Sequence, residues 1–74
     1  MDEETRNKFA WTMAFILEFS KRHGLTLRQG FNYLKVWRGI DFIDRCYQYV
    51  HTQSFPSMVD DVTAYCHRQG GALG

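Results

Sequence analysis

The chain has 74 residues, of which 45% are apolar and 16% aromatic, and its formal net charge is +1. This length allows one small domain over residues 1–74, and the aromatic content is that of a globular protein. A charge so close to zero creates no strong field for nucleic acid or anionic lipid. No apolar run approaches the ~20 residues that cross a bilayer, and the acidic N-terminus is unlike a signal peptide. We therefore expect a cytoplasmic protein without a membrane segment.

The first predicted element is a long helix over residues 2–23. Acidic residues begin it at positions 2–4, where they suit the positive end of the helix dipole, and Lys21 and Arg22 lie at its other end. Gly24 follows and is typical of the residue that ends a helix. All of these end signals agree on one helix.

Apolar residues lie on two sides of this helix. On a wheel of 100° per residue, a ~120° sector is wide enough to form a core face; it holds Phe9, Ala10, Met13, Ile16 and Leu17. A second stripe has three aromatic residues spaced i, i+4 and i+8, namely Trp11, Phe15 and Phe19. We predict that the first set is buried and that the aromatic stripe binds a protein partner, either a second copy or another protein. The alternative is that the remaining helices wrap around and bury both sides.

A second helix is predicted from a capping box at Thr26 and Gln29, and Gly39 is expected to end it. Leu27, Phe31 and Leu34 form its apolar stripe. Gly30 lies in the middle of this helix, where glycine costs ~1 kcal/mol relative to alanine. Close packing against another helix would explain it.

Two further helices complete the chain. Asp41 is expected to cap a helix of about ten residues, followed by a loop over residues 51–56. Ser57 is then expected to cap the last helix, with Asp60 completing the capping box and Asp61 adding charge near the positive end. The predicted fold is therefore all-α, a compact bundle of four helices with one long N-terminal helix and three short ones.

Residues that carry chemistry are sparse. Two cysteines and two histidines, at Cys46, His51, Cys66 and His67, lack the spacing of a structural zinc site. No glycine-rich phosphate loop or nucleophile with an orienting base is evident. We predict no enzymatic activity, no metal and no cofactor, with both cysteines as free thiols. His51 ends the third helix, where the dipole favours it; alternatively, its ring bonds loop carbonyls and organises the turn.

A helix-turn-helix DNA-binding regulator is the alternative class. The segment over residues 26–44 has the right outline, with Gly39 in the turn. However, a recognition helix that carries Asp41 and Asp44 would present acids to phosphates, and it lacks the Arg, Asn or Gln residues that recognise base edges. A protein-interaction module is therefore the preferred hypothesis.

Five short motifs follow one another along the second half of the chain: Gly39-Ile40-Asp41-Phe42-Ile43, Tyr47, His51-Thr52-Gln53-Ser54, Val59-Asp60-Asp61-Val62 and Gly70-Gly71-Ala72-Leu73. With them the chain resembles a family of small bacterial proteins of unknown function that is frequent in gut anaerobes. The resemblance covers essentially the whole chain, and its most specific parts are the Tyr-x-x-x-His-Thr turn and the late Asp pair. Genes of this family often neighbour one for an ADP-ribosyltransferase-like protein. The resemblance therefore implies an antitoxin-like partner of that protein, in which Tyr47, His51 and Thr52 organise the fold or lie at the rim of the interaction surface.

Overall fold

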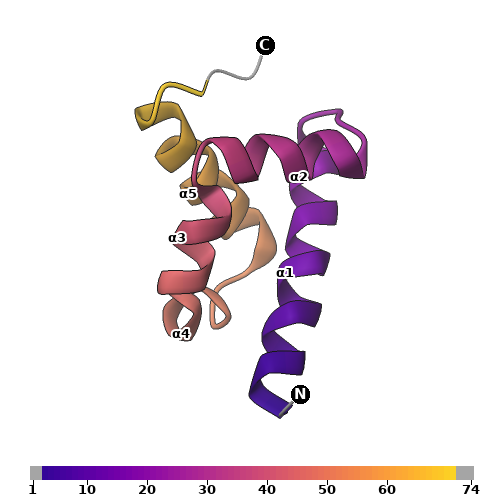
Figure 1. Ribbon diagram of the computed structural model, residues 1–74, viewed down its shortest axis with the longest axis vertical. Helices are drawn as coiled ribbons and strands as arrows, with labels where there is room; N and C mark the ends of the chain where they lie inside the picture. The colour runs from indigo at the N-terminus through magenta and orange to yellow at the C-terminus, as the bar shows by residue number, and fades with distance from the viewer. Residues whose placement is uncertain (1–2, 72–74) are drawn as a thin grey trace.

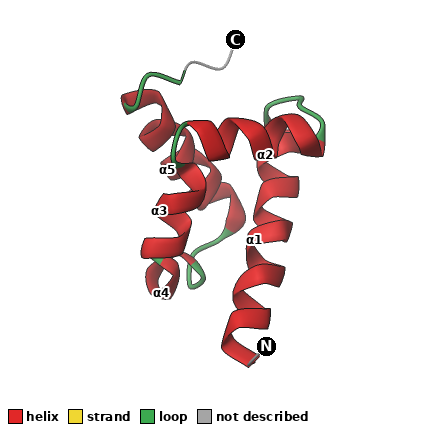
Figure 2. Ribbon diagram, viewed as in Figure 1, coloured by secondary structure: helices red, strands yellow, loops and turns green. Residues whose placement is uncertain are grey.

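The long helix α1 (Glu3–Arg22) stands along one side of the molecule, and α2 (Leu27–Val36) lies across its C-terminal end (Figure 1). The opposite side is formed by α3 (Gly39–Arg45), α4 (Tyr47–Val50) and α5 (Phe55–Arg68). This computed structural model describes residues 3–71, which contain helices and loops but no strand (Figure 2). The predicted all-α fold with a long N-terminal helix is confirmed, while Asp2, Ala72 and Leu73 lie outside the described residues.

The turn between α1 and α2 follows the sequence prediction. Gly24 has a φ of 67°, a left-handed conformation that suits glycine, and the Leu25 N–H donates to the Ser20 carbonyl at 2.8 Å. Thr26 then caps α2: its hydroxyl accepts from the Gln29 N–H at 3.1 Å, and the Gln29 side chain accepts from the Thr26 N–H at 2.9 Å. The capping box is therefore confirmed, and it fixes where α2 begins.

Gly30 is the contact point between α1 and α2. A Cβ atom at this position would overlap the hydroxyl of Ser20, which is buried and donates to the Ile16 carbonyl at 2.7 Å. The prediction that Gly30 allows close helix packing is confirmed. Gly30 and Ser20 together let the two helix backbones approach closely where α2 crosses α1 (Figure 1).

The start of α3 differs from the prediction. Gly39 does not end α2 but is the first residue of α3, and Asp41 is not its cap. Arg38 precedes the helix with a φ of 68°, so the chain turns sharply there. The predicted third helix is also broken at Cys46, where φ is −110° and ψ is 20°, and the four residues after the break form α4. Tertiary packing imposes these two backbone turns, and they leave no periodic pattern in the sequence from which they could be predicted.

The last helix begins three residues earlier than predicted. Ser54 caps α5, and its hydroxyl accepts from the Ser57 N–H at 3.3 Å, so Ser57 is inside the helix and Asp60 completes no capping box. Pro56 lies in the first turn, where its missing N–H leaves no intrahelical bond unmade. The helix ends at Arg68, after which Gly70 has a φ of 105°. Buried Gly71 then packs so closely on the indole of Trp37 that a Cβ there would meet the ring at 2.6 Å.

The core is built around the aromatic stripe of α1. Phe15 and Phe19 are completely buried, and Trp11 packs against the core with part of its surface exposed. Trp11 stacks on Phe15 with ring centroids 5.4 Å apart, and the Phe15 and Phe19 centroids are 6.2 Å apart. Buried residues from the other helices complete the core: Leu34, Ile43, Tyr47, Val50, Met58, Val59, Val62 and Cys66.

The assignment of the two sides of α1 was therefore wrong in the sequence prediction. The aromatic stripe of Trp11, Phe15 and Phe19 faces inward, whereas Phe9, Met13 and Leu17 are exposed; among the residues predicted as the core face, Ile16 alone is buried. The physical reason is area, because each buried aromatic ring removes ~150–250 Å² from water and finds rings to pack against. Those rings belong to Phe55, Tyr47 and Tyr33.

A polar contact joins the C-terminal end of α1 to α5. Arg22 pairs with Asp60 at 2.6 Å, and His23 Nε2 lies 3.0 Å from the Thr63 hydroxyl. Because that hydroxyl donates its proton to the Val59 carbonyl at 2.6 Å, it accepts from His23 Nε2–H. Burial, and then the positive charge of Arg22, lower the pKa of His23 below its ordinary 6.5.

Among the helices over residues 3–71, none combines the length with the hydropathy that a membrane-spanning segment requires.

The orientation of α1 can be tested with one substitution made on each of its two sides. Phe15→Ala should lower the free energy of unfolding by about 3–5 kcal/mol because it leaves a cavity in the core. Phe9→Ala, at a side chain that is 63% exposed, should change it by less than about 1 kcal/mol. Urea unfolding followed by circular dichroism measures both. Equal effects of the two substitutions would contradict the described orientation of α1.

The lowered pKa of His23 predicts a pH dependence of stability. Below about pH 6.5 the unfolded chain binds a proton at this ring that the folded chain resists, so the free energy of unfolding should fall as the pH drops through that range. His23→Gln retains a donor for Thr63 but does not titrate. Unfolding of the two proteins between about pH 7.5 and about pH 5 should therefore show a shallower decline for the variant. Parallel curves would mean that His23 carries no such linkage.

Candidate functional site

With the aromatic stripe buried, α1 presents a different apolar stripe to solvent. Phe9, Met13 and Leu17 are spaced i, i+4 and i+8, and their exposed fractions are 63%, 38% and 43%. The small residues Ala10 and Ala14 lie beside them and are also exposed. We call Phe9, Met13 and Leu17 the free stripe. Three aligned large apolar side chains at a surface are unusual and point to a contact with another molecule.

Two large apolar residues of α2 are exposed as well, close to the helix crossing. Leu27 and Phe31 are 44% and 42% exposed. They lie one turn before and one residue after Gly30, the glycine that contacts Ser20 of α1. Leu17 lies one turn before Ser20, so residues of both helices flank the same crossing. The helical wheel of α1 showed the residues of the free stripe, but the sequence pattern did not show which side of α1 the other helices would cover.

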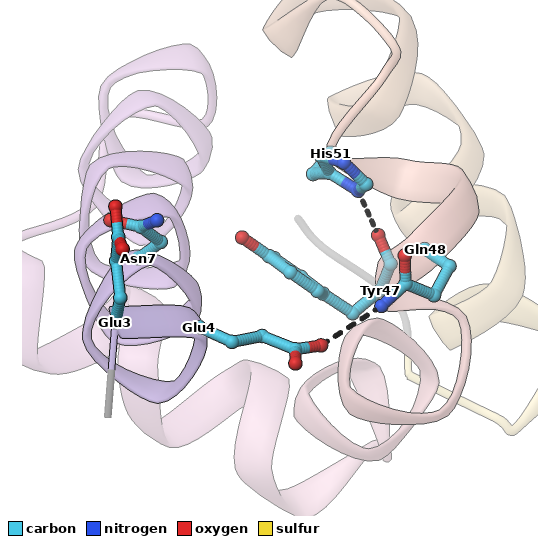
Figure 3. A pocket seen from close by; sticks show the side chains of 6 residues that line it. All are labelled: Glu3, Glu4, Asn7, Tyr47, Gln48 and His51. Carbon is cyan, nitrogen blue, oxygen red and sulfur yellow. Dashed lines mark hydrogen bonds between the residues drawn. The ribbon is translucent and has the colours of Figure 1, made fainter. Parts of the chain in front are cut away.

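A polar cleft of about 610 Å³ lies between the first turns of α1 and the short helix α4 (Figure 3). The hydroxyl of Tyr47 points into the space between the two helices, and the Gln48 side chain donates to a Glu4 carboxylate oxygen at 3.1 Å. The lining residues are Glu3, Glu4, Asn7, Tyr47, Gln48 and His51. The cleft therefore brings together Tyr47 and His51, the first and fifth residues of the Tyr-x-x-x-His-Thr turn.

His51 and Tyr47 hold each other in place (Figure 3). The rings are stacked with centroids 4.8 Å apart, and His51 Nδ1 lies 2.7 Å from the Tyr47 carbonyl oxygen. A carbonyl can only accept, so Nδ1 carries the proton and Nε2 is an acceptor when the ring is neutral. The bonded carbonyl belongs to the first residue of α4, whereas the sequence interpretation placed this contact on loop carbonyls.

Other motif residues make local contacts that define the turn and the helix packing. The Thr52 hydroxyl donates to the Tyr49 carbonyl at 2.6 Å and accepts from the Gln53 side chain at 3.1 Å. Gly39 is buried where α3 meets α2 and α5. The two aspartates of the late pair differ in their contacts. Asp60 of α5 forms an ion pair with Arg22 of α1, and Asp61 is exposed.

The groups that could carry chemistry are dispersed. Cys46 and Cys66 are free thiols, and burial raises the pKa of the Cys66 thiol to about 11, so it is protonated at neutral pH. Within residues 3–71, no group of three or more His, Cys, Asp or Glu side chains is placed to hold a metal ion.

Gly39 provides a test of the motif's structural role. A Cβ there would lie 2.6 Å from Leu34 Cδ2, 3.1 Å from Cys66 Sγ and 3.2 Å from Val62 Cγ1. Gly39→Ala should therefore lower the free energy of unfolding by about 1–3 kcal/mol, because all three neighbours are buried. Chemical unfolding measures it, and the loss should shrink when Leu34→Ala supplies space. A loss of the same size in both backgrounds would mean that crowding is not its cause.

Comparison with known proteins places the chain in a family. No curated protein and no solved structure matches it. A family model described as a protein of unknown function, DUF3791, matches residues 10–69, which include α2 to α5 and most of α1. The resemblance to a family of unknown function is thereby confirmed at that level, and the chain belongs to the DUF3791 family.

Proposed function

We propose that this chain is a non-enzymatic protein-interaction module and that its binding surface is the free stripe of α1 with Leu27 and Phe31 of α2. The observation that carries the proposal is the exposure of Phe9, Met13 and Leu17 in one row. These five side chains expose about 450 Å² if each has ~200 Å² of surface when fully exposed. The largest apolar patch on a typical monomeric protein covers a few hundred Å² and often belongs to a functional contact.

The family resemblance supplies a partner for this module. Genes of such families often neighbour one for an ADP-ribosyltransferase-like protein, and a small protein that neutralises an enzyme must offer a surface to it. We therefore propose an antitoxin-like role in which the apolar surface binds that neighbouring protein. The acids and bases around the surface, including Arg6 and Lys21, would form the polar rim that interfaces of this kind have.

The helix-turn-helix alternative gains no support from the contacts of α3. Asp41 and Asp44, both exposed on this helix, pair with Arg38 and Lys8 respectively. Two basic side chains that contact α3 are thus paired with its acidic residues, whereas DNA-binding proteins direct such groups to phosphates.

Co-expression with the protein encoded by the neighbouring gene tests the proposed function. The two proteins should co-purify, and the double variant Phe9→Ser with Leu17→Ser should reduce recovery of the complex at least about tenfold, because it removes apolar anchors. Val36→Ser is the matched control, since Val36 is an apolar residue of α2 that is 65% exposed outside the proposed surface. Circular dichroism confirms that each variant is folded.

The proposal is wrong if the wild-type proteins do not associate. It is also wrong if the double variant binds as well as the wild-type chain does. If Val36→Ser reduces recovery of the complex as much as the double variant does, the contact involves another part of α2.

A further inference from the structure

We infer that, while no other partner is bound, a second copy of this chain covers the free stripe, with the two α1 helices packed antiparallel. This inference rests on the proposed function because it names an occupant of the same surface. A partner protein would then displace the second copy. The arguments are the placement of charges along α1, the shape of the free stripe and the area it offers.

The charges of α1 favour an antiparallel pair. Glu3 and Lys21 are both exposed and are 21 − 3 = 18 residues apart, which is five full turns, so they lie at the same angular position. In an antiparallel pair, residues on the same flank of the two helices face each other, and Glu3 of one copy lies near Lys21 of the other. A parallel pair would instead bring the two acidic first turns together and the two basic last turns together.

The free stripe matches itself in the same orientation. With Met13 at the centre of the pair, Phe9 of one copy lies opposite Leu17 of the other, since both are four residues from Met13. Exposed Ala10 and Ala14 offer little bulk beside the stripe, so the larger side chains can pack over them. Leu27 and Phe31 lie within one turn of Gly30, which contacts Ser20 one turn beyond Leu17, so we include them at the Leu17 end of the proposed contact.

The available area suits a dimer of ordinary size. A standard interface buries about 800 Å² on each partner, of which about 60% is apolar. The free stripe with Leu27 and Phe31 supplies about 450 Å² of large apolar side chain, which is close to that apolar share. The charged flanks of α1 supply a polar rim.

The oligomeric state of the purified full chain is the first test. Sedimentation equilibrium between about 10 μM and about 500 μM should show a monomer–dimer equilibrium, and the thermal unfolding midpoint should rise with concentration. The double variant Phe9→Ser with Leu17→Ser should weaken the dimer at least about tenfold, while Val36→Ser should change its Kd less than about twofold. A wild-type chain that stays monomeric throughout this range overturns the inference.

Cysteine cross-linking tests the orientation. In a Cys46→Ser background, where the remaining Cys66 is buried, Phe9→Cys and Leu17→Cys are prepared separately, one with an added tag. On mixing and mild oxidation, an antiparallel pair should yield mainly the disulfide between Phe9→Cys and Leu17→Cys chains. Disulfides formed mainly between two Phe9→Cys chains would show a parallel pair and overturn the proposed arrangement.

The outcomes separate this inference from the proposed function. A monomeric chain that forms a one-to-one complex with the neighbouring protein overturns self-association and leaves the proposed function standing. A cross-linked antiparallel dimer that fails to bind the neighbouring protein supports the inference and removes the proposed partner.

Discussion

The contact on which the rest of the structure depends is the row of aromatic rings along α1. Phe55 of α5 packs on Trp11, Tyr47 of α4 meets the same indole edge-on, and Tyr33 of α2 stacks on Phe19. Three other helices therefore find their positions against one face of one helix. Because so much aromatic area is buried there, rotating α1 about its axis would expose more apolar surface than it could cover. The rings thus fix which residues of α1 can reach a partner.

The free stripe is a consequence of that choice. A helix that carries apolar residues on two sides can give only one of them to a core assembled from four shorter helices, and the aromatic side offers more area. Phe9, Met13 and Leu17 are left outside, in a row along α1 of which Leu17 lies one turn from the crossing with α2. The polar cleft beside Tyr47 and His51 lies at the opposite end of α1 from that crossing.

Local rules of sequence predicted the parts of the fold that depend on local contacts. The left-handed Gly24, the capping box at Thr26 and the close approach at Gly30 all follow from residues near one another in sequence or from the size of one side chain. The break at Cys46 and the start of α3 could not be predicted, because they result from packing between distant segments. The sequence prediction that Trp11, Phe15 and Phe19 bind a partner failed for the same reason. A helical wheel locates two apolar stripes on α1, but it does not show that the rings of Phe55 and Tyr33 pack against one of them.

The two tryptophans occupy different ends of the folded unit. Trp11 lies among the rings of α1, α4 and α5, whereas Trp37 follows α2 and lies against Gly71. Neither belongs to the free stripe, and both pack against the core, so unfolding changes the environment of each indole more than contact through that stripe does. Intrinsic fluorescence can therefore follow folding separately from assembly, and the same emission samples both halves of the molecule without an added label.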